Sequence, residues 1–305
     1  MIVSRICPLI DWFQAVFNDC TIEDVFGSIG VNYLITDDVE KVFAERFWIS
    51  EGYVTNLVFN FNGIIVKVRG YELQQLLHEH GMNDVEELDV SVFDWVFPYV
   101  NITLSGSTLE FLRQSGVDVN SILFKPLLLP EGASYHVTRV DFAFDLVNYM
   151  PNFLDDCLEQ VKRSALPSGR LMSKGQGGMC YTVRKGNKEK TLYLGSTKSN
   201  KLLRIYDKNM QYQFKQGSNP YAEGDELPDS WIRVELQTRR AEECHKLLYG
   251  CEGDMLKVLR YVYDNFALVE SDGSKYGQER HVSECWITLF DWEGISKIIQ
   301  NANFG

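Results

Sequence analysis

The chain has 305 residues, of which 45% are hydrophobic and 13% aromatic, so it can bury a sizeable core, which excludes a disordered chain. No apolar run reaches the roughly 18 residues needed to span a bilayer. The first residues lack the features of a signal peptide, and the seven scattered cysteines contain no CxxC pair, which indicates reduced thiols in a cytoplasmic protein. The net charge of −12 argues at first against a nucleic-acid partner.

The amino-terminal part of the chain mixes helical and strand patterns. Apolar spacing over residues 9–26 predicts a helix with a break in its second half, after which Thr21 marks a new helix start. Residues 53–69 place strand formers on both sides of an Asn-Gly dipeptide, which predicts a β-hairpin. A serine or threonine of residues 105–108 is expected to cap an apolar helical pattern that ends at Gly116.

The connector at residues 127–134 is the best candidate for an internal boundary. It divides the chain into an N-terminal α+β half, 1–130, and a catalytic half, 131–305, which we expect to pack as one compact unit. The sequence of the second half predicts strands at 136–147, at both ends of 191–208 and at 231–239. A helical pattern follows over residues 240–268. The mixture predicts an α+β fold with a mainly antiparallel central sheet and flanking helices.

The charge is distributed unevenly along the chain. Residues 161–215 contain 13 lysines and arginines, opposed only by Glu189 and Asp207. This window therefore carries +11 and the rest of the chain −23. Such asymmetry favours a basic strip that binds a polyanion on an acidic body. The alternative is a lysine-rich face of a hairpin that simply contacts water.

Two predicted strands repeat one pattern of charged residues. Alternation along a strand places Arg139, Asp141 and Asp145 on one face, and Arg233 with Glu235 on the corresponding face of the other strand. If the strands are neighbours, Asp141 and Glu235 lie close together, and hard carboxylate oxygens suit Mg²⁺ or Mn²⁺. The alternative is a pair of cross-strand ion pairs, Arg139 with Glu235 and Arg233 with Asp141.

Tyr206 stands out among 15 tyrosines because of its neighbours. Arg204 lies two residues before it and Lys208 two residues after it, so all three share a face of an extended strand. A phenol is a poor nucleophile at its usual pKa of about 10, and nearby cations favour the phenolate and can hold a phosphate. The alternative is a tyrosine that serves only packing.

These segments together resemble a known family. The ordered motifs RVDFAFD, LYLGSTKS with LRIYDK, and W-x-RVELQ, with a weaker echo in IDWF, resemble the rolling-circle replication initiators of the Rep-trans (replication initiation factor) type. The resemblance covers about residues 95–245 and implies a fold related to the HUH endonucleases. It also implies a nicking and joining enzyme that acts on single-stranded or hairpin origin DNA, with a host replication helicase and a second copy of the chain as further partners and no membrane.

The resemblance assigns a role to each candidate residue. Tyr206 attacks a DNA phosphodiester, leaving a 5′-phosphotyrosine and a free 3′-OH that primes synthesis, and Lys198, Arg204 and Lys208 position the phosphate. Asp141 and Glu235, with Asp145 as a further candidate, hold Mg²⁺ or Mn²⁺. The residues expected to contact DNA are Ser196, Lys198, Ser199, Lys201, Arg139, Arg233, Lys185 and Lys188.

Three other functions fit the same residues. A relaxase for conjugative transfer would use the same chemistry. A metal-dependent nuclease would use water as the nucleophile in place of Tyr206. A non-catalytic DNA-binding protein would bind DNA without cleaving it. Formation of a covalent protein–DNA adduct separates the tyrosine mechanism from the last two.

Overall fold

The structure is a computed structural model and describes residues 4–34, 48–50, 53–61, 63–69, 75, 77–82, 90–157, 191–196, 198–210, 228–267, 269–271, 280–282, 284–291 and 295. The chain divides into two compact units that are discontinuous in sequence. The amino-terminal unit contains residues 10–140 and 239–253, and the carboxy-terminal unit contains residues 1–9, 141–238 and 254–305. The contiguous halves 1–130 and 131–305 stay a prediction.

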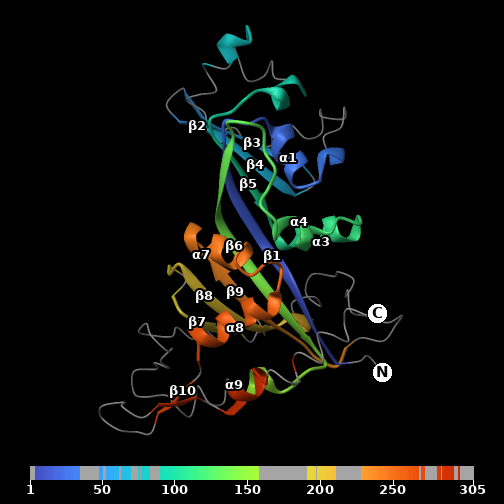
Figure 1. Cartoon of the computed structure of the whole chain (residues 1–305), viewed down its shortest axis with the longest axis vertical. Helices are drawn as coiled ribbons and strands as arrows, with labels where there is room; N and C mark the ends of the chain where they lie inside the picture. The colour runs from blue at the N-terminus through green and yellow to red at the C-terminus, as the bar shows by residue number, and fades with distance from the viewer. Residues whose placement is uncertain are drawn as a thin grey trace. The chain divides into compact units, whose positions relative to one another are not determined.

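Antiparallel strands form the sheet of the amino-terminal unit, in the order β2-β3-β4-β5-β1 with β6 beside β1 (Figure 1). The strands are β1 (Arg5–Asn18), β2 (Trp48–Ser50), β3 (Tyr53–Phe61), β4 (Ile64–Arg69), β5 (Val100–Leu104) and β6 (Ser134–Val147). The helices of this unit are α1 (Ile22–Ser28), α3 (Gly106–Gln114), α4 (Val119–Leu123) and α7 (Ala241–Leu248), with 3₁₀ turns η1 (Asn32–Leu34) and η4 (Val90–Asp94).

The helix predicted over the first half of residues 9–26 is wrong, because this segment belongs to strand β1. Phe13 through Phe17 pair with β5 in antiparallel register. Apolar side chains are buried on both faces of the strand, including Ala15 and Val16, which are adjacent in sequence. A strand covered on both faces loses the alternation that identifies strands, and its apolar residues then mimic helical spacing.

Two local predictions in this unit are confirmed. Thr21 caps α1 in a capping box, since its Oγ1 accepts from the Asp24 amide at 2.9 Å and its own amide donates to Asp24 Oδ2 at 3.0 Å. The hairpin is formed by β3 and β4, with Phe61 opposite Ile64 and Gly63 at φ +94°, a backbone conformation that favours glycine.

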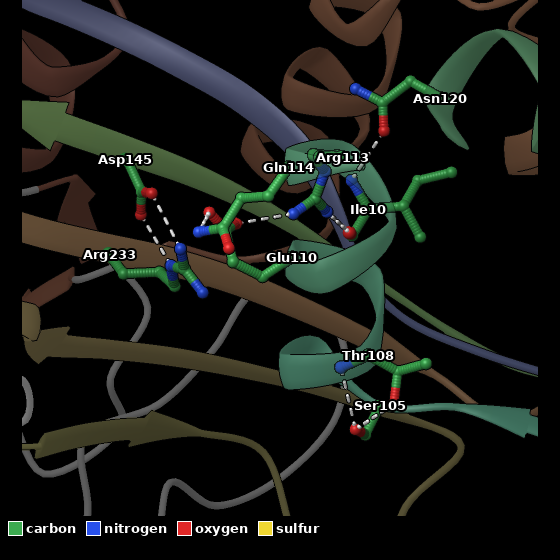
Figure 2. Close-up of polar contacts among 9 residues, drawn as sticks. All are labelled: Ile10, Ser105, Thr108, Glu110, Arg113, Gln114, Asn120, Asp145 and Arg233. Atoms are coloured by element: carbon green, nitrogen blue, oxygen red, sulfur yellow. Dashed lines mark hydrogen bonds and ion pairs between the residues drawn. The ribbon is translucent and has the colours of Figure 1, made fainter. Parts of the chain in front are cut away.

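The serine or threonine cap predicted at the start of α3 is Ser105, and its removal gives a local test of the fold. Its Oγ accepts from the Thr108 amide at 3.3 Å (Figure 2). Ser105→Ala is expected to lower the free energy of unfolding by about 1 kcal/mol, because an amide at the helix start loses its acceptor. Urea denaturation measures the change. An unchanged free energy of unfolding in Ser105→Ala would contradict the capping role.

The carboxy-terminal unit contains the strands on which the candidate residues lie, in the order β6-β9-β8-β7 (Figure 1). Its further elements are β7 (Thr191–Leu194), β8 (Lys201–Asp207), β9 (Trp231–Thr238), α8 (Met255–Asn265), β10 (Val269–Ser271), β11 (Arg280–Val282) and α9 (Glu284–Leu289). The predicted strand–turn–strand at 191–208 and the strand at 231–239 are thus confirmed. None of the helices in the described residues is long and apolar enough to cross a membrane.

One face of this sheet is apolar and carries the core. Phe142 and Phe144 of β6, Val234 and Leu236 of β9 and Ile205 of β8 are all at most 1% exposed. Helix α8 lies beside β8, where Lys201 Nζ is 4.9 Å from the centre of the Tyr261 ring. Burial of the alternate residues fixes the register of β8 and β9, because a slip of one residue would move every charged side chain into the core.

Candidate active site

Strands β8 and β9 place the candidate residues on one face by their register. Arg204 pairs with Glu235, and Tyr206 pairs with Arg233. On the other side of β8, Tyr193 of β7 lies opposite Arg204. Residues directly opposite each other in an antiparallel pair share a face and lie within side-chain contact. The face therefore collects a tyrosine, two arginines and a carboxylate from two neighbouring strands.

Strand β6 adds a second carboxylate to this face. Asp141 and Glu235 are each 1% exposed, and their carboxyl groups contact each other. The Arg204 guanidinium bridges them, with Nη2 at 3.3 Å from Asp141 Oδ2 and in contact with Glu235 Oε1. The predicted proximity of Asp141 and Glu235 is thus present, and the cation between them is Arg204.

Tyr206 contacts the same carboxylate pair. Its hydroxyl donates to Glu235 Oε2 at 3.0 Å, so the two oxygens of Glu235 have different partners, Tyr206 on one side and Arg204 on the other. Lys208 Nζ lies 5.6 Å from the centre of the Tyr206 ring, within the range of a cation–π contact. The structure therefore brings Arg204 and Lys208, but not Lys198, to Tyr206, and Glu235 lies within hydrogen-bond distance of the tyrosine proton.

The charges of this cluster depend strongly on burial. Burial raises the pKa of Glu235 above its ordinary value, the adjacent Asp141 acts in the same direction, and Arg204 opposes both. Burial alone would lower the pKa of Arg204, but the charges of Glu235 and Asp141 raise it. Arg204 therefore stays protonated, and the site holds one permanent cation beside a carboxyl group whose affinity for a proton is increased.

Asp145 lies further along β6 and pairs with a different arginine. Arg233 donates from Nε to Asp145 Oδ1 at 2.6 Å and from Nη2 to Oδ2 at 2.7 Å, the two-point contact seen in Figure 2. Four residues of an extended strand separate Asp145 from Asp141 by about 13 Å. The structure therefore does not bring Asp145 to the other two carboxylates, and both members of this pair are buried.

The arginine partners differ from the predicted cross-strand pairs. Glu235 pairs with Arg204, and Arg233 pairs with Asp145. Arg139 belongs to the amino-terminal unit, where its guanidinium lies 4.3 Å from the centre of the Trp12 ring. Burial of Arg233 also removes it from the surface on which DNA was expected to contact it, because only 5% of the residue is exposed.

The turn between β7 and β8 is built largely from its own hydrogen bonds. Ser196 Oγ accepts from the Lys198 amide at 3.2 Å, and Ser199 donates through Oγ to the Ser196 carbonyl at 2.7 Å. Along an extended strand, Lys201 at the start of β8 is about 17 Å from Tyr206. The turn residues and Tyr206 therefore cannot contact the same phosphate group.

Most of the predicted basic strip falls outside the described residues. This applies to Lys185, Lys188 and seven other cations of residues 161–215, while Lys198, Lys201, Arg204 and Lys208 are described. Lys198 is exposed, and Lys201 is half-buried against Tyr261. The role of the strip in DNA binding stays a prediction.

Gln237 belongs to the site and was not predicted as part of it. Its Nε2 donates to Asp141 Oδ2 at 3.2 Å, and 3% of the residue is exposed. The alternation that places Glu235 on this face places Gln237 there too. A buried amide that donates to a carboxylate orients that carboxylate. The strand alternation in the sequence was therefore enough to predict Gln237 as part of the site.

The donor set fits a hard divalent cation. Asp141 and Glu235 offer two buried carboxylates that already share a cation, Arg204, and oxygen donors of this kind suit Mg²⁺ or Mn²⁺. Within the described ranges no cluster of three or more His, Cys, Asp or Glu side chains gathers. Water and phosphate oxygens would therefore have to complete the coordination, as is common for Mg²⁺.

Comparisons with known proteins agree with this architecture. The structure is similar to that of a rolling circle replication initiator protein from Geobacillus stearothermophilus, with a TM-score of 0.56, 16% identity, and coverage of 96% of this chain and 98% of that chain. At this identity the likeness shows the fold alone, and it confirms the predicted α+β class with an antiparallel sheet. No curated protein matches the sequence. The family model described as Replication initiation factor (Rep_trans) matches residues 135–298, more than half of the chain and including β8, β9 and nearly all of β6, so the chain belongs to the replication initiation factor family.

Proposed function

We propose that the protein starts rolling-circle replication by nicking one DNA strand, with Tyr206 as the nucleophile. The observation that carries the proposal is the 3.0 Å hydrogen bond from the Tyr206 hydroxyl to Glu235, beside the buried Asp141–Glu235 pair. A general base must lie within about 2.6–3.2 Å of the proton it removes.

The chemistry follows from these positions. Tyr206 Oη attacks the phosphorus as its proton passes to Glu235 Oε2. The bond from phosphorus to the 3′ oxygen breaks, giving a 5′-phosphotyrosine, and the leaving 3′ oxygen takes a proton from water to become a 3′-OH that can prime synthesis. Arg204 and Lys208 place positive charge near the phosphate as negative charge develops on its oxygens. Held by Asp141 and Glu235, Mg²⁺ or Mn²⁺ would polarise a non-bridging phosphate oxygen.

The substrate we propose is single-stranded DNA or the loop of a hairpin at an origin. Tyr206 and Arg204 lie on one sheet face and are partly exposed, so the backbone of an unpaired DNA strand can approach them. The same chemistry would serve a relaxase of a conjugative element. The genes beside its coding sequence distinguish these two uses.

An adduct assay tests the proposal. The protein is incubated with Mn²⁺ and labelled single-stranded oligonucleotides that tile the DNA flanking its coding sequence, and the products are then denatured. A labelled protein band that survives denaturation supports the tyrosine mechanism. Cleaved ends without an adduct would favour a nuclease that uses water, and binding without cleavage would favour a non-catalytic DNA-binding protein.

The carboxylates have a separate test. Asp141→Asn and Glu235→Gln are each expected to reduce nicking at least about 100-fold and to abolish its dependence on Mn²⁺, because each removes one anionic oxygen donor. The measurement is the nicking rate as a function of Mn²⁺ concentration. Asp264→Asn removes a carboxylate from the exposed part of α8 and should leave the titration unchanged. Unaltered Mn²⁺ titrations in the first two variants would refute the metal assignment.

A further inference from the structure

Arg204 occupies the position that a divalent cation would need. Its Nη2 contacts Asp141 Oδ2 and Glu235 Oε1 at once. Both carboxylates are 1% exposed, so few directions remain from which a second cation could reach the same oxygens. A guanidinium and a metal ion both supply the positive charge that two adjacent carboxylates require. A divalent cation held by Asp141 and Glu235 would therefore share the site that Arg204 occupies.

The contact of Arg204 with these carboxylates is incomplete. Its Nε is buried and has no hydrogen-bond acceptor in the described part of the chain. A buried donor without an acceptor is destabilising, because the hydrogen bond that it lost to water is not replaced. The side chain of Arg204 is nevertheless 28% exposed, so the guanidinium has a route to solvent.

Arg233 on the same face provides a direct comparison. It uses Nε and Nη2 on the two oxygens of Asp145, and only 6% of its side chain is exposed. Two parallel contacts of this kind are the strongest geometry for an arginine and a carboxylate. The face thus holds one arginine with a complete buried contact and one with an incomplete contact and a path outward.

We propose, on the basis of the function proposed above, that Arg204 is an exchangeable counter-ion: it and the divalent metal compete for Asp141 and Glu235, and metal binding releases the guanidinium toward the DNA phosphate. Released, Arg204 lies two residues before Tyr206 on the same strand face, where its planar donors can bind a phosphate. Arg204 thereby links metal loading to positioning of the scissile phosphate.

The competition has a measurable consequence for metal affinity. When a site is blocked for part of the time, its apparent affinity equals its intrinsic affinity multiplied by the fraction of time for which it is free. If Arg204 occupies the carboxylates for about nine-tenths of the time, its removal should tighten Mn²⁺ binding about tenfold. Most substitutions beside a metal site weaken metal binding, so an increase in Mn²⁺ affinity would indicate competition between Arg204 and the metal.

The test is a titration of the full-length protein with Mn²⁺ alone, in which bound and free ion are separated by the EPR signal of free Mn²⁺. Arg204→Gln is expected to bind Mn²⁺ about tenfold more tightly than the parent. The matched control is Lys201→Gln, which removes the same charge from the same strand at a residue that contacts Tyr261, and it should bind Mn²⁺ like the parent.

Arg204→Lys keeps the test decisive if Arg204→Gln does not fold. Lysine retains the charge as a single point and bridges two carboxylates less well than a guanidinium, so its Mn²⁺ affinity should exceed that of the parent. Far-UV circular dichroism confirms that each variant is folded before it is titrated.

The outcomes separate this inference from the proposed function. Equal or weaker Mn²⁺ binding by the folded arginine variants, in a parent that forms the DNA adduct, overturns the exchange and leaves the tyrosine mechanism standing. A parent that forms no adduct overturns the proposed function, whichever affinity the variants show. Tighter binding by Arg204→Gln, lost when Asp141→Asn is added, supports the exchange at this carboxylate pair.

Discussion

Tyr206→Phe is expected to abolish the covalent protein–DNA adduct while leaving the protein folded. The substitution removes one oxygen, the atom that we propose attacks phosphorus and that donates to Glu235. Loss of a nucleophile reduces such reactions by at least about 10³-fold, which places the adduct below detection. Loss of one hydrogen bond to a carboxylate should lower the free energy of unfolding by about 1–2 kcal/mol, and thermal unfolding measures this.

Tyr193→Phe is the matched control for this experiment. Tyr193 lies opposite Arg204 on β7, on the same face, and is half-buried as Tyr206 is. Its hydroxyl has no role in the proposed reaction, so this variant should form the adduct at the parental rate. An adduct that persists in Tyr206→Phe would assign the nucleophile to another tyrosine, and Tyr212, outside the described residues, would be substituted next.

The site was predictable to the extent that strand alternation determines which side chains share a face. Asp141, Glu235 and Tyr206 were placed together from alternation and from the family resemblance, and the structure brings them into contact. The arginine partners could not be deduced in this way. Which arginine meets which carboxylate depends on the register and neighbours of the strands, and β8 lies beside β9, so Arg204 reaches Glu235.

Prediction of the fold was limited in the same way where an element depends on residues far away in the sequence. The hairpin at β3 and β4 and the cap at Thr21 depend on residues close in sequence, and both were predicted. Strand β1 depends on pairing with β5, more than 80 residues later, and its apolar spacing gave no sign of it. Local signals identify turns and caps, while a strand buried on both faces is recognised only through its partner.

The buried pair of Asp145 and Arg233 gives the largest expected effect on stability. Asp145→Asn leaves a guanidinium charge in an interior where the arginine is 5% exposed. Removing one partner of a buried ion pair costs about 3–5 kcal/mol, and here the buried Arg233 guanidinium loses both hydrogen bonds to Asp145, with the charge of Glu235 still acting on it. In a protein of this size that loss corresponds to a melting temperature lowered by about 5–8 °C, measured by differential scanning calorimetry.

Two further variants serve as comparisons for the stability of Asp145→Asn. Arg260 and Asp264 form an ion pair one turn apart in α8 with both side chains more than half exposed, so Asp264→Asn should cost less than about 0.5 kcal/mol. Replacing Asp145 and Arg233 together by Leu and Met removes both charges and should recover most of the stability. Mn²⁺ affinity separates this ion-pair role from the metal role predicted for Asp145: unchanged affinity in Asp145→Asn supports the ion pair, whereas a loss matching that of Asp141→Asn would make Asp145 a metal ligand.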